Sequence, residues 1–208
     1  MTHTIFNKLR MIEKENRRNA IVDVAEQILH NEGLEAVTIR KVANEAGLSS
    51  GAMYMYFSNK EELLLSMLVR NLKVLKCDMS DCLDNNNPVE AIKKMGYHYK
   101  RYFIRFGKHI NLLRFAVKNN QTPQQLKPYL LDDLNSTLSD LLSLVQQLLS
   151  SPSMEEPLKG IPPERAVPVF WALIQGLVQI TLPGSGPSSD LISFDFDQLI
   201  NDATRIFT

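Results

Sequence analysis

Apolar residues recur along the chain at helical spacing, and no segment shows the alternation that is typical of a strand. Several helix boundaries carry the expected signals: Thr38, Ser49 and Asn59 suit helix starts, and Gly33 and Gly47 follow helix ends. The predicted helices cover residues 14–31, 38–46, 49–57, 59–83, 88–106, 108–119, 124–150, 164–182 and 195–207. We therefore expect an all-α protein of about nine helices.

The apolar segment over residues 166–182 raises the question of a membrane span. Pro168, Gln175 and Gln179 interrupt it, and roughly 20 mainly apolar residues are needed to cross a bilayer. A buried helix is therefore the better interpretation. The N-terminus also lacks the apolar core of a signal peptide, so we expect a cytoplasmic protein without a membrane partner.

Residues 38–60 combine a short helix, a turn with a glycine and a second short helix. This is the helix-turn-helix arrangement, whose second helix enters the major groove of DNA. Ser49, Ser50 and Gly51 begin the second helix, where free backbone N–H groups attract phosphate and glycine allows close approach. Further candidates for contacts to phosphates and bases are Tyr54, Tyr56 and Lys60. The alternative is an ordinary helical hairpin whose tyrosines only pack.

A long set of residues at fixed spacing favours the DNA-binding interpretation. The set comprises Thr38, Val42, Ala43, Ala46, Gly47, Leu48, Ser49, Gly51, Tyr54, Tyr56, Phe57, Lys60, Glu61, Glu62 and Leu63. With this pattern, residues 14–65 resemble the N-terminal DNA-binding domain of the TetR/AcrR family of bacterial transcriptional regulators. The resemblance implies a three-helix helix-turn-helix domain with an N-terminal arm over residues 1–62. It also implies a helical ligand-binding and dimerisation domain over residues 63–208.

The resemblance further implies how the first domain would contact DNA. Thr38, Tyr54, Tyr56 and Lys60 would hold phosphates. Ser50, Gly51 and Met55 would face base edges, with Arg40 able to contact either, and the basic arm over residues 1–18 could reach phosphate or the minor groove. A solvated, flexible tail is the alternative for the arm. The small core of this domain would comprise Ala43, Ala46, Leu48, Met53 and Phe57.

In this family the C-terminal domain resembles a helical cage around a small and mostly apolar ligand. The resemblance thus implies that part of the aromatic stripe of the helix over residues 88–106 lines a pocket, although plain core packing is the alternative. The candidate pocket residues are Met95, Tyr99, Phe103, Phe106, Phe115 and Trp171. The other face of the same helix is basic, and either solvation or an acidic ligand would explain it.

The helix over residues 164–182 is apolar nearly all round, which implies burial on two sides. Together with the helix over residues 195–207 it resembles the four-helix homodimer interface of the family. The candidate interface residues are Ala172, Gly176, Gln179 and Ile200. A two-fold dimer implies a palindromic operator with half-sites about one DNA turn, roughly 34–36 Å, apart.

The balance of charge at first argues against a nucleic-acid partner, because 23 basic residues face 23 acidic ones. The balance is an average, however: residues 1–62 carry a net charge of −1, residues 63–130 of +8 and residues 131–208 of −7. Cations of the first domain gather in the arm and at Arg40, Lys41 and Lys60. We therefore expect modest affinity for random DNA and binding that depends on a dimer and a fitted site.

Signals for catalysis or a cofactor are missing from the sequence. Cys77 and Cys82 point away from each other in one helix, and the four histidines show no ligand spacing. We expect no metal, no cofactor and no enzyme activity. The sequence thus predicts a ligand-responsive repressor that a small molecule releases from its operator. The alternative is a helical protein that binds small molecules but no specific DNA, and an enzyme of helical fold is a more distant one.

Overall fold

The computed structural model describes residues 2–84, 87–106, 127–154, 158, 160–181 and 194–206, with side chains from residue 5 onward. Within these ranges the chain forms eight α-helices and three short 3-10 turns, and no strand is found there. This confirms the all-α prediction. The helix expected over residues 108–119 lies outside the described residues, as does Phe115.

The described residues divide into two compact units, and each is treated by itself. The first comprises residues 2–70 with 127–132, and the second comprises residues 71–106 with 133–206. The helix α4 (Lys60–Ser80) therefore begins in the first unit and ends in the second. The domain boundary that the sequence predicts after residue 62 falls inside this helix and stays a prediction.

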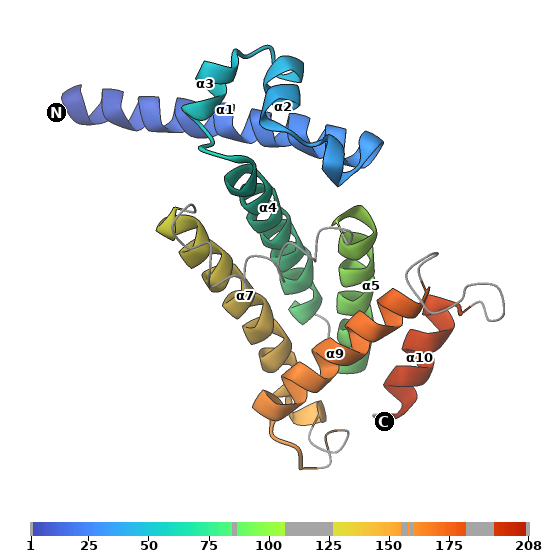
Figure 1. The fold of residues 1–208 in the computed structure, drawn as a ribbon. Coiled ribbons are helices and arrows are strands. Elements are labelled where there is room, and N and C mark those ends of the chain that lie inside the picture. Colours follow the sequence, from blue (N-terminus) through green and yellow to red (C-terminus); the bar gives the residue numbers. More distant parts are fainter. Residues whose placement is uncertain are drawn as a thin grey trace. The chain divides into compact units, whose positions relative to one another are not determined.

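Three helices and the start of a fourth build the first unit. α1 (Thr2–Glu32) is followed by a 3-10 turn (Leu34–Ala36), α2 (Ile39–Glu45) and α3 (Ser50–Tyr54). α2 and α3 lie on the same side of α1 (Figure 1). The core between them includes Val42, Met53, Phe57 and Leu63, each with 0% exposure. Ala43 is buried as expected, and Ala46 and Leu48 are half-buried.

α1 begins far earlier than the sequence analysis expects. The helix starts at Thr2 rather than near residue 14, because residues 2–32 contain neither glycine nor proline to interrupt it. The basic arm is thus helical from residue 2. Its apolar side chains Ile5, Phe6, Leu9 and Met11 are exposed.

The second unit contains the end of α4 and four further helices. These are α5 (Pro88–Phe106), α7 (Pro128–Leu149, from Asp133 onward), α9 (Pro163–Thr181) and α10 (Phe196–Ile206). Two 3-10 turns, Asp81–Asp84 and Pro152–Met154, also belong to it. A proline occupies the first position of α5, α7 and α9, where its missing N–H costs no hydrogen bond.

α5, α9 and α10 pack against one another in this unit (Figure 1). Gly96 lets α10 approach α5 closely, because an added Cβ would lie 2.4 Å from Cδ1 of Ile200 and 3.2 Å from Cδ1 of Ile174. The ring centroids of Tyr97 and Phe196 lie 5.5 Å apart. On the other side of the unit, Lys73 and Lys76 of α4 form ion pairs with acidic residues of α7.

Candidate functional site

The helix-turn-helix has well-formed helix starts that follow directly from the sequence. The side-chain oxygen of Thr38 accepts a hydrogen bond from the Lys41 N–H at 3.1 Å, and that of Ser49 accepts one from the Ala52 N–H at 3.1 Å. Both residues have the extended backbone of an N-cap. Between the two helices Gly47 takes φ = 66°, a left-handed conformation that favours glycine. The local sequence thus fixes the angle at which α3 leaves α2.

Gly51 has no role of this kind within the chain. Its φ is not left-handed, and the nearest atom to an added Cβ would be Oγ of Ser49 at 3.9 Å, an ordinary contact. Neither backbone conformation nor packing therefore requires glycine in α3, where alanine would favour the helix. A glycine with open space in front of it, at the start of this helix, leaves room for an external partner to approach the backbone.

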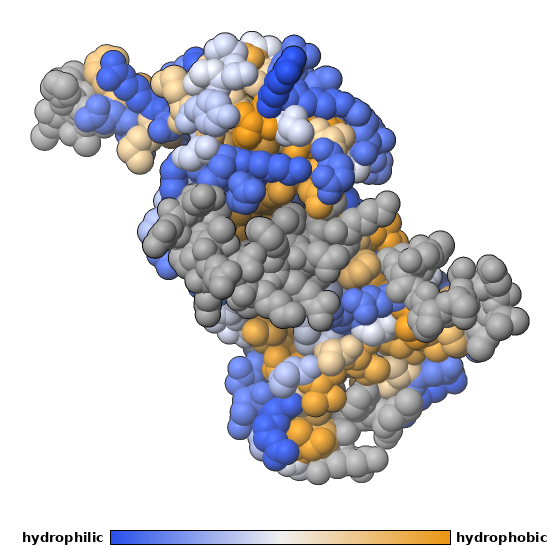
Figure 2. Space-filling model, in the orientation of Figure 1, coloured by the Kyte–Doolittle hydropathy of each residue, from blue (hydrophilic) through white to orange (hydrophobic). Residues whose placement is uncertain are grey.

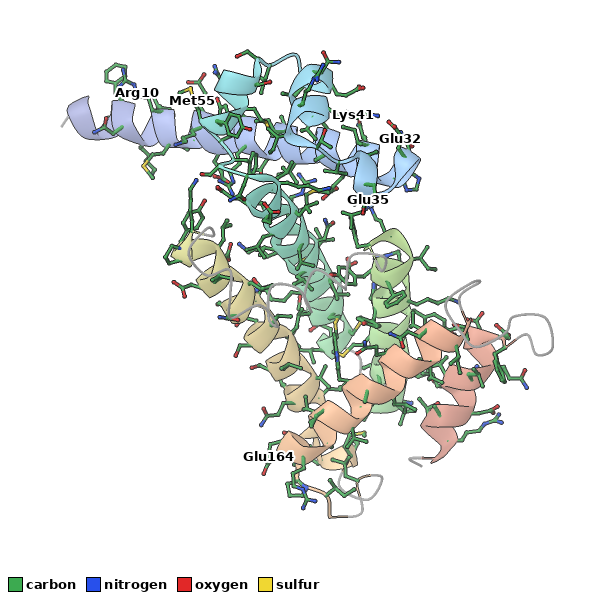
Figure 3. The ribbon with its side chains drawn as sticks, in the orientation of Figure 1. Arg10, Glu32, Glu35, Lys41, Met55 and Glu164 are labelled. Carbon is green, nitrogen blue, oxygen red and sulfur yellow. The ribbon has the colours of Figure 1, made fainter. Side chains whose placement is uncertain are left out.

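Two large side chains at the end of α3 project into solvent. Tyr54 is 57% exposed and Met55 is 73% exposed, whereas their neighbour Met53 is completely buried. Figure 3 labels Met55 at the surface of the first unit. Both side chains are therefore accessible to a partner that binds at the end of α3. Their assignment to phosphates and base edges stays a prediction.

A polar hollow lies beside this surface, between α2 and the start of α3. It is lined by Thr38, Arg40, Lys41, Ala43, Asn44, Leu48, Ser49 and Ser50. Arg40 is exposed and has no hydrogen-bond or ion-pair partner among the described residues. Lys41 is instead paired with Glu32, which lies next to it in Figure 3. Arg40 is therefore the cation of the hollow that is free to meet an anion.

The structure gives Tyr56 and Lys60 other surroundings than the sequence predicts. Tyr56 is half-buried and packs against the core of the first unit. Lys60 is also half-buried, and its Nζ donates to the backbone oxygen of Leu34 at 3.4 Å. Both side chains thus contact their own unit while keeping part of their surface exposed, and their assignment to phosphates stays a prediction.

The cations of α1 are also partly engaged. Arg17 forms an ion pair with Glu13 at 2.6 Å, and hydrogen bonding to Tyr56, followed by the charge of Glu13, raises the pKa of Arg17. The side chain of Arg18 is only 15% exposed, because it reaches inward to the start of α4. Arg18 is therefore unsuited to the role in the basic arm that the sequence analysis gives it. Lys8, Arg10 and Lys14 remain exposed.

Comparisons with known proteins agree with this geometry. Residues 21–67 match the family model described as "Bacterial regulatory proteins, tetR family". This part of the chain is therefore a TetR-family domain.

Individual TetR-family relatives cover different shares of the chain. The fatty acid metabolism regulator protein of Bacillus subtilis is 24% identical over 144 residues, which are 67% of this chain and 70% of that protein. The transcriptional repressor KstR2 of Mycobacterium tuberculosis is 33% identical over 79 residues, 38% of this chain and 40% of that protein. The crystal structure of AibR in complex with isovaleryl coenzyme A and operator DNA has the same fold, with a TM-score of 0.62 at 15% identity over 90% of this chain and 96% of that one.

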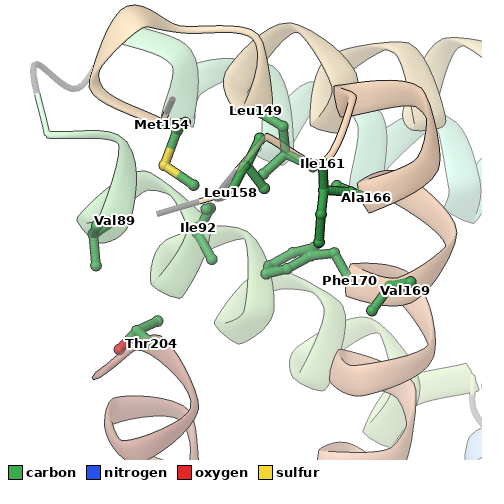
Figure 4. A pocket seen from close by; sticks show the side chains of 10 residues that line it. All are labelled: Val89, Ile92, Leu149, Met154, Leu158, Ile161, Ala166, Val169, Phe170 and Thr204. Atoms are coloured by element: carbon green, nitrogen blue, oxygen red, sulfur yellow. The ribbon is translucent and has the colours of Figure 1, made fainter. Parts of the chain in front are cut away.

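The second unit contains an apolar pocket with a volume of about 80 Å³. Figure 4 shows the ten residues that line it: Val89, Ile92, Leu149, Met154, Leu158, Ile161, Ala166, Val169, Phe170 and Thr204. Thr204 is the polar member of this set, and its hydroxyl is hydrogen-bonded to backbone oxygens of α10. The lining thus suits an apolar group.

Of the proposed pocket residues, those that the structure describes do not line this pocket. Met95, Tyr99, Phe103 and Phe106 are buried, and Trp171 is half-buried with its ring centroid 4.9 Å from that of Tyr99. Rings of α5 also contact one another, as those of Tyr99 and Phe103 do, and a ligand-lining role for these residues stays a prediction. The pocket is lined by Ile92 of the apolar stripe of α5 and by the aromatic Phe170 of α9, beside smaller side chains such as Ala166.

Three of the four proposed interface residues have accessible surface. Ala172 and Gln179 are exposed and Gly176 is half-buried. Ile200, by contrast, has 0% exposure and lies against Gly96 in the core of the second unit. This corrects the expectation for Ile200, because an interface residue needs exposed surface on the protomer.

The basic face of α5 is largely engaged within the second unit. Lys93 pairs with Glu90 and Arg101 with Asp78, and Nζ of Lys100 lies 4.4 Å from the ring centroid of Phe196. These contacts account for three of the cations without an acidic ligand, whereas Lys94 of the same face is exposed. Within the described ranges, no cluster of metal-binding side chains is found, and no helix is long and apolar enough to cross a membrane.

Proposed function

We propose that this chain is a ligand-responsive transcriptional repressor that binds a palindromic operator as a homodimer. A small molecule bound in the second unit releases it from the DNA. The role places the protein in the cytoplasm, with operator DNA and an effector as its partners and with no catalytic step. The TetR-family match over residues 21–67 supports the proposal.

The observation that carries the proposal is the combination of features around α3. Gly51 is open to the outside, Tyr54 and Met55 are exposed, and Arg40 is an unpaired cation of the adjacent hollow among the described residues. A close backbone approach, a cation for phosphate and two side chains for base edges are what major-groove recognition requires. An ordinary helical hairpin would have no reason to expose these groups together.

An exposed apolar surface on α9 supports the homodimer. Val169 is 60% exposed and Ile180 is 41% exposed, and the small or polar side chains Ala172 and Gln179 are exposed as well. Figure 2 shows hydrophobic side chains gathered over this part of the second unit. A two-fold pairing of this face would bury it and would set two copies of α3 for half-sites about one DNA turn apart.

The apolar pocket supports an effector with a short apolar group. Its volume of about 80 Å³ is well below the roughly 300–1,000 Å³ of most complete ligand sites. It therefore has room for a few carbon atoms and not for a whole effector. One relative is named a fatty acid metabolism regulator protein, and one structure of this fold is a complex with isovaleryl coenzyme A. On this basis we propose an acyl group for this pocket.

Operator binding is tested by selecting duplexes from a random library with the full chain and titrating the selected duplex over a range of salt. A specific regulator prefers this duplex to a scrambled one, and its affinity falls steeply with salt because counterions are released. Arg40→Ala should reduce the slope of log affinity against log salt by about 1. Lys94→Ala removes an exposed cation from α5 and serves as the matched control, with an unchanged slope.

The result that overturns the proposal is equal and salt-insensitive binding of selected and scrambled duplexes. The protein would then be a helical small-molecule binder without specific DNA recognition. The effector is tested separately by thermal unfolding with isovaleryl coenzyme A against coenzyme A alone. A rise in the melting temperature with the acylated compound only would support the acyl group, since ligands that bind the folded state stabilise it.

A further inference from the structure

The side chain of Glu62 is completely buried at the start of α4, with 0% exposure. Its own N–H donates to Oδ1 of Asn59 at 2.7 Å, and its Oε2 accepts from the Ser58 N–H at 2.9 Å. Its Oε1 accepts from Nζ of Lys127 at 2.8 Å and lies 3.4 Å from Nη1 of Arg18. A buried carboxylate is costly unless it is paired and hydrogen-bonded. Here it has one backbone donor and two cations.

Arg18 extends this arrangement to the end of α3. Its Nη1 donates to the backbone oxygen of Tyr56 at 3.2 Å and to the hydroxyl of Tyr129 at 3.0 Å. Its Nη2 donates to Oγ of Ser66 at 2.6 Å, and its guanidinium lies 4.5 Å from the ring centroid of Phe57. One side chain of α1 thus contacts the turn after α3, the first turns of α4 and the start of α7.

Together, these groups connect three segments that are far apart in the sequence: α1 at Arg18, residues 56–66 and residues 127–129. Arg18 is 44 residues from Glu62, and Lys127 is 65 residues from it. The planar guanidinium has several donors in fixed directions, so it can orient several partners at once. The backbone oxygen of Tyr56 is the partner nearest to the exposed residues Tyr54 and Met55.

We infer that Glu62 is a positioning residue for operator recognition, which holds Arg18 and Lys127 so that the end of α3 is fixed against α1 and the start of α7. This inference rests on the proposed function. Glu62 touches no DNA in this role. It acts through Arg18 on the backbone of the turn that follows Tyr54 and Met55. Since α4 and α7 both continue into the second unit, the same cluster lies at the start of two helices that the units share.

The neighbouring residue Glu61 provides a matched control. Glu61 is exposed in the same turn of α4, so Glu61→Gln and Glu62→Gln remove the same charge from nearly the same place. Simple electrostatics predicts that both variants bind DNA slightly better. Positioning predicts that Glu62→Gln alone binds the selected operator about tenfold more weakly, because hydrogen bonds to charged groups typically contribute a factor of ten or more.

The experiment measures the affinity of both full-length variants for the selected duplex and for a scrambled duplex of equal length. We expect Glu62→Gln to lose affinity for the selected duplex only, since a shifted α3 still attracts phosphates. Circular dichroism confirms that each variant is folded at the temperature of the assay. Equal binding of the selected duplex by both variants, or an equal loss on both duplexes, would overturn the inference.

Lys127 supplies a second set of variants if Glu62→Gln does not fold. Lys127→Met removes the cation and keeps the aliphatic chain, and Lys127→Arg retains a donor for the carboxylate. Positioning requires that the first variant loses operator selectivity and that the second retains it, whereas equal behaviour of the two contradicts it. If the wild-type chain selects no duplex at all, the proposed function fails, and that result is distinct from any difference between variants.

Discussion

Replacing Gly51 by alanine separates the demands of the fold from those of a partner. The substitution adds one methyl group at the second residue of α3. Inside the protein this methyl group would meet only Oγ of Ser49, at 3.9 Å. It would displace no atom and would require no change of backbone conformation. The fold should therefore accept Gly51→Ala without loss.

The two effects of Gly51→Ala should have opposite signs. Alanine within a helix is more favourable than glycine by roughly 0.5–1 kcal/mol, so the free energy of unfolding should stay unchanged or rise. At the DNA, a methyl group between the backbone of α3 and the bases would disturb contacts that typically contribute about 1–3 kcal/mol each. With two half-sites per dimer, affinity for the selected operator should fall by at least about tenfold.

The assay combines thermal or urea unfolding with a fluorescence-anisotropy titration of the selected duplex. Gly47→Ala is the control, because it makes the same chemical change four residues earlier at φ = 66°. A left-handed alanine is strained by about 1–2 kcal/mol, so this variant should be less stable. Any loss of operator affinity in Gly47→Ala should be explained by the smaller fraction of folded protein.

Two results would refute the reasoning about Gly51. If Gly51→Ala binds the selected duplex within about twofold of the wild type, the open space in front of α3 does not receive DNA. If the variant is clearly destabilised, glycine is required by the fold itself. In either case the exposed surface around Tyr54 and Met55 would need another explanation.

Three further predictions concern stability. Gly96→Ala should lower the free energy of unfolding, measured by urea titration, by about 1–3 kcal/mol. The added Cβ would lie 2.4 Å from Cδ1 of Ile200. Unchanged stability would mean that α10 can move away from α5 without cost. Tyr102→Phe should raise the melting temperature or leave it unchanged, because the buried hydroxyl of Tyr102 has no hydrogen-bond partner among the described residues. A clear fall in the melting temperature would show that the hydroxyl does have a partner. Burial alone would raise the pKa of Glu62, but hydrogen bonds from Lys127 and Ser58 outweigh it and lower the pKa below its ordinary 4.5. The stability that ionised Glu62 adds is therefore present above pH 4.5 and is lost as the pH falls further. The urea midpoints of the wild type and of Glu62→Gln should accordingly converge between pH 7 and pH 3. A difference between the two midpoints that stays constant over this range would contradict the prediction.

Local signals in the sequence were enough to predict the helix-turn-helix. Thr38 and Ser49 are N-caps, and Gly47 is left-handed, as their residue types indicate. Each of these features depends on atoms within about four residues, so periodicity and capping suffice to find it. The predicted helix begins about twelve residues later than α1 does. The apolar residues in the first turns of α1 are exposed, and they do not form the amphipathic stripe by which a helix is recognised in a sequence.

Side-chain surroundings were harder to predict, because they depend on contacts between distant segments. The sequence marks the aromatic residues of α5 as apolar but does not say whether they enclose a space or fill it. The ring centroids of Tyr99 and Tyr102 lie 6.1 Å apart, and a ligand-lining role for these rings stays a prediction. The burial of Ile200 within the protomer could not be predicted for the same reason, since an apolar helix of this kind suits a dimer interface and a protomer core equally well.

Arg18 and Lys60 show the same limit for charged residues. Both are predicted from the sequence to face DNA as cations. Arg18 contacts Glu62 instead, whereas the half-buried Lys60 also contacts the backbone oxygen of Leu34 and its phosphate contact stays a prediction. No pattern within one helix could have paired Arg18 with a carboxylate 44 residues away. Charge and spacing identify a cation, but only its neighbours in space decide whether it is free.

The sequence by itself thus determined the helical fold, the helix-turn-helix and its resemblance to the TetR family, since these depend on short-range periodicity, capping and a fixed motif. Only the tertiary structure decided which of the marked residues are exposed, where the second unit leaves an apolar pocket, and that Glu62 is buried between Arg18 and Lys127. The physical reason is that burial and ion pairing arise between residues that the chain brings together from far apart.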